Sequence, residues 1–153
     1  MTISKTIAVV HNPIPENACE DERDVLDQGE EIAETLTGLA YQTHIMTFIS
    51  DPTALKQALT QMNPACIFNL VEAVEGDSQL QFFAPALYDH MRIPYTGATT
   101  ESLFLTTHKV LAKRLMALTG IPTAGWLALG ETPRIPLDFP APYIIKPICE
   151  EAS

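Results

Sequence analysis

The chain has 153 residues, of which 19 are acidic and 9 basic, so its formal net charge is −10, and 46% of its residues are hydrophobic. This length and composition are typical of a folded globular protein. The negative charge disfavours nucleic acid and anionic lipid surfaces as partners. No stretch approaches the roughly 20 apolar residues that a membrane-spanning helix needs, and the 3 cysteines lack C-x-x-C spacing. We therefore predict a cytoplasmic protein with free thiols and without a disulfide framework or a zinc site.

The first half of the chain alternates apolar strands with helices. The run "TIAVVHN" is rich in β-branched residues and predicts a buried strand over 6–12, and the apolar spacing in 21–39 predicts an amphipathic helix. A strand over 41–49, a short helix over 52–62 and a strand over 65–72 follow. This order predicts an α/β fold, a mostly parallel, Rossmann-like sheet with helices on both faces. Ligands bind such sheets at the carboxyl ends of the strands.

Strand and helix continue to alternate up to Gly120. A helix is predicted over 76–91 with Asp77 or Ser78 as its cap, and "IPYTG" predicts a short strand over 93–97. Next comes a helix over 107–119, in which Thr106 or Thr107 serves as the cap and Gly120 takes the left-handed position past the end. We expect four apolar side chains to pack this helix against the domain: Val110, Leu111, Leu115 and Leu118.

The pattern changes after Gly120. "IPTAGWLALG" predicts a strand over 121–130, the proline-rich stretch 131–142 excludes regular structure, and "YIIKP" predicts a last strand over 143–147. We therefore predict an α/β domain over 1–120, followed by a connector and the first strand of a second subdomain over 121–153. Since an isolated strand cannot bury its apolar residues, we expect 140–153 to pack on its own domain, on "GWLALG" or on a second copy of the chain.

Few residue patterns in the sequence point directly to chemistry. G-x-G-x-x-G and the Walker pattern are both absent, and the 4 histidines show no metal-ligand spacing, so no metal site is predicted from this chain. Lys109, in the first turn of a helix, and Lys146, at the end of an apolar strand, could together bind the phosphates of one nucleotide. The other interpretation is that Lys109 and Lys113 form a solvated face and that the acidic turn "VEAVEGD" only decorates the surface. Spacing alone favours this second interpretation.

Four ordered motifs, "EGDSQLQ", "IPYTG", "HKVLAKRLMALTGIPT" and "IIKP", resemble the D-alanine–D-alanine ligase-like branch of the ATP-grasp family. The resemblance runs from Ile7 to the last residue. It implies a pre-ATP-grasp domain followed by the start of an ATP-binding subdomain, so we expect the chain to be an N-terminal fragment of a longer ligase. It also implies that ATP and Mg²⁺ are used by the parent protein, with metal ligands that lie outside this chain.

The resemblance assigns roles to particular residues. Lys109 and Lys146 match lysines that hold the ATP phosphates, and Ser153 stands where the family's phosphate loop carries a serine. Glu22 resembles a glutamate that positions the amine of the first substrate, although the loop before it is longer here. Two sites depart from the pattern: Glu72-Ala73 replaces a His-Gly, and Glu151-Ala152-Ser153 replaces a Gly-Ser-Ser-like loop.

These residues lead to two hypotheses from different functional classes. The leading one is that the parent protein is an ATP-dependent carboxylate–amine ligase that forms an acylphosphate from a small amino acid or carboxylate, and that the isolated chain is inactive. The alternative is a stand-alone α/β interaction or regulatory module without catalysis. A homodimer through the N-terminal domain is a further expectation, because the resembled family commonly dimerises there.

Overall fold

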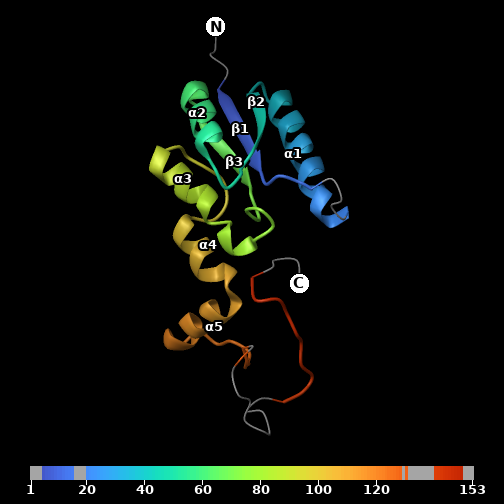
Figure 1. The fold of residues 1–153 in the computed structure, drawn as a ribbon, viewed down its shortest axis with the longest axis vertical. Helices are drawn as coiled ribbons and strands as arrows, with labels where there is room; N and C mark the ends of the chain where they lie inside the picture. The colour runs from blue at the N-terminus through green and yellow to red at the C-terminus, as the bar shows by residue number, and fades with distance from the viewer. Residues whose placement is uncertain (1–4, 16–19, 129, 131–139, 150–153) are drawn as a thin grey trace.

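The chain forms a parallel α/β domain that continues into a column of two helices (Figure 1). The structure is a computed structural model that describes residues 5–15, 20–128, 130 and 140–149, without the side chains of 20–22. Its elements, in chain order, are β1 (Thr6–His11), α1 (Glu20–Gly38), β2 (Gln42–Thr47), α2 (Thr53–Met62), β3 (Cys66–Leu70), the 3₁₀ turn η1 (Ser78–Leu80), α3 (Phe83–Met91), α4 (Thr100–Thr107) and α5 (Lys109–Leu118).

The sheet has the order β2-β1-β3, and both pairings are parallel. β1 is central because its β-branched and small side chains tolerate burial on both faces, and Ala8, Val9 and Val10 are fully buried. β2 lies at the edge and exposes every other side chain or more, including Ile45. The predicted α/β class and its parallel sheet are confirmed.

The predicted strand over 93–97 is reduced to one bridge, between Ile67 and Tyr95. Ile67 donates to the carbonyl of Pro94 at 2.8 Å and accepts from the amide of Thr96 at 2.9 Å. The next amide of β3 in the ladder, that of Asn69, instead donates to the hydroxyl of Thr96 at 3.1 Å. The side chain of Thr96 thus ends the ladder, and Gly97 turns the chain away with a φ of 94°.

Helices cover both faces of the sheet, as predicted. α1 packs on β1 and β2, with Val25 buried, and the chain at Gly29 passes close to Leu70. The other face carries the main apolar core, to which α2 and α3 contribute. Its buried members are Ala8, Val10, Phe48, Leu55, Leu59, Ile67, Val71, Val74, Ala84 and Tyr88.

One predicted helix is divided in the structure, and a helix that was not predicted precedes another. Asp77 is a cap as predicted, since its carboxylate accepts from the amide of Gln79 at 2.8 Å, but it caps the short turn η1, and α3 begins only at Phe83. Further on, α4 occupies 100–107, where no helix is predicted before residue 107, and His108 separates it from α5. The signal missed was Thr99, which caps α4 through the amide of Ser102 and precedes an acidic first turn at Glu101.

The predicted caps Thr106 and Thr107 are wrong, because both lie inside α4. The hydroxyl of Thr106 donates to the carbonyl of Ser102, and that of Thr107 accepts from Gln81. His108 takes the role instead: its Nδ1 accepts from the amide of Leu111 at 3.2 Å. Gly120 does occupy the predicted left-handed position, with a φ of 74°.

The predicted packing of α5 is wrong at two positions. Leu115 is 40% exposed, Leu118 is 85% exposed, and no residue of α5 is buried. The helix extends past the sheet, where α4 is its main neighbour (Figure 1). The described residues of 121–130 and 143–147 contain no strand, because no strand lies beside them to supply hydrogen bonds. Ile144 and Ile145 are exposed, so within the described residues 140–149 the predicted packing of the tail is found at Cys149, which is buried.

Candidate ligand site at the carboxyl edge of the sheet

The strands end toward η1, the α4–α5 junction and the last described residues (Figure 1). β1 ends in the buried His11, whose ring nitrogen Nδ1 lies 2.7 Å from the carbonyl of Asn12. The side-chain oxygen of Asn12 accepts from the amide of Glu72 at 3.2 Å. This bond ties the segment after β1 to the segment after β3 and fixes the edge at which ligands of parallel sheets bind.

The acidic turn after β3 is an ordered part of this edge. Val74 and Asp77 exchange two backbone hydrogen bonds, and the chain reverses between them through Glu75 and Gly76, which both have positive φ. The hydroxyl of Ser50 donates to the carboxylate of Glu75. Since Asp77 caps η1, the carboxylates of Glu75 and Asp77 both have structural partners. The interpretation that they merely decorate the surface is therefore wrong for Glu75 and Asp77.

A buried hydrogen bond joins this turn to the helical column. The side-chain amide of Gln81, 3% exposed, donates to the hydroxyl of Thr107 at 2.8 Å. Gln81 follows η1 and Thr107 ends α4, so the bond spans 26 positions of sequence. It places the start of α5, and with it Lys109, beside the carboxyl edge of the sheet.

We expect Thr107→Val to lower the free energy of unfolding by about 1–3 kcal/mol, because it leaves the buried amide of Gln81 without its acceptor. Adding Gln81→Leu to that variant should cost less than the sum of the two single changes, since both polar groups are then gone. Urea unfolding of the two single variants and the double variant measures the coupling. Additive costs would show that the two side chains do not interact.

The segment that carries Lys146 meets the helix that carries Lys109. The amide of Lys109 donates to the carbonyl of Ile148 at 2.9 Å. Lys146 precedes Ile148 by two residues, a span of about 7 Å of extended chain. Lys109 is half-buried, whereas Lys146 is exposed. The two predicted phosphate ligands therefore lie on segments in direct contact, although they are 37 positions apart in sequence.

Cys149 directly follows Ile148, which bonds to the start of α5, and it is 9% exposed. Burial, assisted by the negative charge of Asp77, raises the pKa of its thiol above the ordinary value, and the cation of Lys109 opposes that rise. A group whose pKa is raised by folding adds stability at pH values below its unfolded pKa and loses that contribution as the pH rises through the folded pKa. The folded protein thus favours the neutral, less reactive thiol.

We expect iodoacetamide to alkylate Cys149 more slowly in the folded chain than in the urea-unfolded chain, at any pH from 7 to 9. Asp77→Asn removes the neighbouring negative charge and retains a capping side chain, so it should lower the pKa and speed alkylation by about two- to fivefold. Mass spectrometry of peptides sampled over time reports this cysteine separately from Cys66. A rate unchanged by Asp77→Asn would contradict the assigned electrostatic contact.

Of the four predicted site residues, the structure describes the side chains of two. Lys109 and Lys146 lie on two segments that are in contact through the backbone bond between Lys109 and Ile148. Glu22 lies on α1, but its side chain is outside the described residues, and so is the whole of Ser153. In the part of the chain that the structure describes, no group of three or more His, Cys, Asp or Glu side chains could hold a metal ion.

Lys113 has a role that the sequence analysis did not find. Its ammonium donates to the hydroxyl of Thr123 at 3.0 Å and to the carbonyl of Ala124 at 2.9 Å, and it lies 5.6 Å from the centre of the Trp126 ring. A lysine followed about ten positions later by a turn and a tryptophan is too general a signal to predict such contacts. Lys113 therefore holds the start of the connector against α5.

The fold and this edge define an α/β domain of the kind that binds small ligands at the carboxyl ends of parallel strands. In structure the chain is similar to the D-alanine–D-alanine ligase of Bacillus anthracis, with a TM-score of 0.61 and 17% identity over 81% of this chain and 38% of that one. At this identity the likeness concerns the fold.

Sequence comparison finds relatives with the same name. The chain is 29% identical over 86% of its length to the D-alanine–D-alanine ligase of Coprothermobacter proteolyticus, and 30% identical over 97% to that of Acidiphilium cryptum. It spans 44% and 47% of these two relatives. No family model matches the sequence. The resemblance to D-alanine–D-alanine ligases, which the four motifs indicate, is thereby confirmed. None of the helices formed by the described residues is both long and apolar enough to span a membrane.

Proposed function

We propose that this chain is the N-terminal part of an ATP-dependent ligase that joins a carboxylate to an amine. The observation that carries the proposal is the hydrogen bond between Lys109 and Ile148, which brings two lysine-bearing segments together at the carboxyl edge of the sheet. A pair of ammonium groups on separate segments can bind a polyphosphate from two sides. The sequence relatives named D-alanine–D-alanine ligase support the same class of reaction.

The proposed reaction has two steps. A carboxylate oxygen of the first substrate attacks the γ-phosphorus of ATP, which forms an acylphosphate and releases ADP. The amine of the second substrate then attacks the acyl carbon, loses a proton and expels phosphate. Lys109 and Lys146 stabilise the negative charge on the phosphates. Mg²⁺ neutralises phosphate charge when bound, and it is assigned here to ligands outside the described residues, which provide no metal cluster.

The substrates are proposed only as a class, a small amino acid or another carboxylate with an amine. Glu72 and Ala73 stand where the resembled family has a His-Gly, at the end of the segment that Asn12 holds. An acidic side chain in this position repels a substrate carboxylate and attracts an amine. Glu22 would help to position that amine from α1. A cytoplasmic location and a homodimer through the N-terminal domain belong to the same proposal.

Calorimetric titration with ATP and Mg²⁺ tests the proposal. We expect the 153-residue chain to bind ATP with a dissociation constant weaker than about 1 mM, and to be inactive alone, because its two lysines are only part of a nucleotide site. The longest form of the protein that the gene encodes should bind it at least about a hundredfold more tightly. Equal affinity of the two forms would contradict the idea that residues beyond this chain complete the site.

A further inference from the structure

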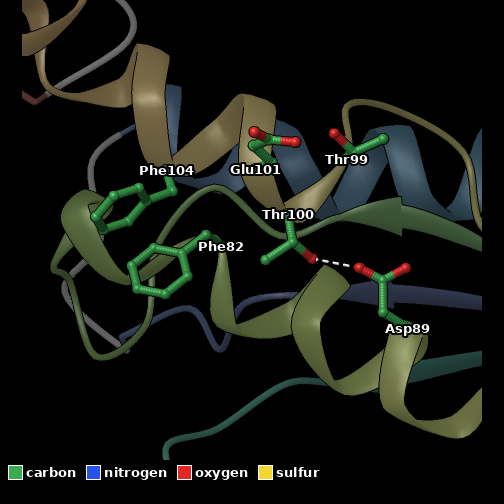
Figure 2. A pocket seen from close by; sticks show the side chains of 6 residues that line it. All are labelled: Phe82, Asp89, Thr99, Thr100, Glu101 and Phe104. Atoms are coloured by element: carbon green, nitrogen blue, oxygen red, sulfur yellow. Dashed lines mark hydrogen bonds between the residues drawn. The ribbon is translucent and has the colours of Figure 1, made fainter.

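A second feature, separate from the carboxyl edge, lies between α3 and α4. It is an open hollow of about 530 Å³ lined by Phe82, Asp89, Thr99, Thr100, Glu101 and Phe104. In Figure 2 the two phenylalanine rings stand at one end of the hollow and Asp89 at the other. Neither predicted lysine lines it, and the proposed ligase reaction makes no use of it.

The two carboxylates of the hollow differ in how they are held. Asp89 accepts from the hydroxyl of Thr100 at 2.6 Å and from that of Tyr95 at 3.1 Å, so its orientation is fixed from two other segments. Both donors are neutral, and no cationic side chain among the described residues pairs with this carboxylate. Glu101 is exposed in the first turn of α4 and has no hydrogen-bonded or ionic partner among the described residues. The hollow therefore carries negative charge without a cation from the described chain.

The aromatic end supplies a different kind of contact. The rings of Phe82 and Phe104 meet edge to face, with their centres 5.3 Å apart, and Phe104 is 54% exposed. An exposed ring face attracts cations as well as apolar groups, and a ring beside a carboxylate is suited to a group that has both properties. The guanidinium of arginine stacks on aromatic rings and pairs with carboxylates, and its stem is apolar.

From this combination we propose that the hollow binds an arginine side chain of a partner protein. An open hollow encloses too little of a small molecule to hold it tightly, whereas an arginine presented by a partner is held from its other side as well. The formal net charge of −10 favours the approach of a basic partner. Asp89 pairs with the guanidinium, Glu101 adds a second negative charge at the rim, and Phe104 covers the stem.

The test uses a defined probe, the peptide acetyl-Gly-Arg-Gly-Arg-Gly-amide, titrated into the full chain at physiological salt and followed by amide NMR shifts. We expect shifts concentrated in α3 and α4, and a loss of affinity of about three- to tenfold in Glu101→Gln and in Phe104→Ala. Both side chains are exposed, so the variants should fold, and their melting temperatures verify this.

Matched controls separate a built site from general attraction. Glu31→Gln removes one exposed carboxylate from α1 and should change the affinity by less than about twofold. The lysine version of the peptide should bind more weakly than the arginine version. The proposal is overturned if Glu31→Gln and Glu101→Gln weaken binding equally, if the peptide does not bind, or if light scattering shows that Phe104→Ala dissociates a dimer in which a second copy fills the hollow. None of these outcomes depends on ATP binding, so they test this inference independently of the proposed ligase function.

Discussion

Replacing Tyr88 by alanine is expected to lower the free energy of unfolding by about 3–5 kcal/mol, a large part of the roughly 5–15 kcal/mol available to a domain of this kind. Tyr88 lies on α3, is fully buried and belongs to the core on one face of the sheet. Its ring centre is 5.5 Å from that of Tyr95, and its hydroxyl donates to Asn69 at 3.3 Å. Burial also raises the pKa of its phenol, which therefore stays neutral at physiological pH.

Urea unfolding followed by circular dichroism measures this change, with two comparisons. Tyr88→Phe keeps the ring and removes only the bond to Asn69, so it should cost about 0.5–1.5 kcal/mol. Tyr143→Ala removes the same side chain from an exposed position in the tail and should cost less than about 0.5 kcal/mol. If Tyr88→Ala cost no more than Tyr143→Ala, the packing of α3 on the sheet would be refuted.

The second large effect concerns nucleotide binding and rests on the proposed function. In the longest form of the protein, Lys146→Ala should weaken ATP binding by about 10- to 100-fold, the loss expected for one charge-assisted contact to phosphate. Lys109→Ala should cause a loss of similar size, since its helix meets the Lys146 segment at Ile148. Calorimetric titration with ATP and Mg²⁺ gives both affinities.

The structure also decides which lysine serves as the control. The sequence alone suggests Lys113, one turn beyond Lys109, and predicts that Lys146→Ala weakens ATP binding more than Lys113→Ala. Lys113, however, holds Thr123 and Ala124, so its removal disturbs the connector. Lys56 is exposed on α2, beside His90, and Lys56→Ala removes the same charge elsewhere. If Lys56→Ala and Lys146→Ala weakened ATP binding equally, Lys109 and Lys146 would be solvated side chains and not phosphate ligands.

Local sequence patterns determined most of the parallel α/β part of the chain. The run of β1 is apolar at every buried position except His11 at its end, so the central strand follows from composition and length. The alternation of strands and helices determined the parallel pairing, because such crossovers are right-handed and place helices on the faces. The cap at Asp77 and the left-handed Gly120 were equally predictable, since each depends on contacts or conformations within a few residues.

The candidate site was predictable only as a pair of lysines. Sequence motifs selected Lys109 and Lys146, but their approach depends on a hydrogen bond across 39 positions, from Lys109 to Ile148. The buried state of Cys149 and the role of Lys113 likewise arise from contacts between segments that no local pattern specifies. The roles of Glu22 and Ser153 remain predictions.

Only the tertiary structure decided where the helices break and where strands fail to form. In sequence Thr107 has the features of a cap. In the structure its hydroxyl accepts a hydrogen bond from Gln81, 26 positions earlier, and His108 caps α5 instead. Tyr143, Ile144 and Ile145 have the β propensity of a strand, but a strand exists only when a neighbour accepts and donates its hydrogen bonds. The sequence by itself thus determined the elements that short-range forces stabilise. Partners distant in the chain decided the cap of α5, the edges of the sheet and the contact between the two segments that carry the lysines.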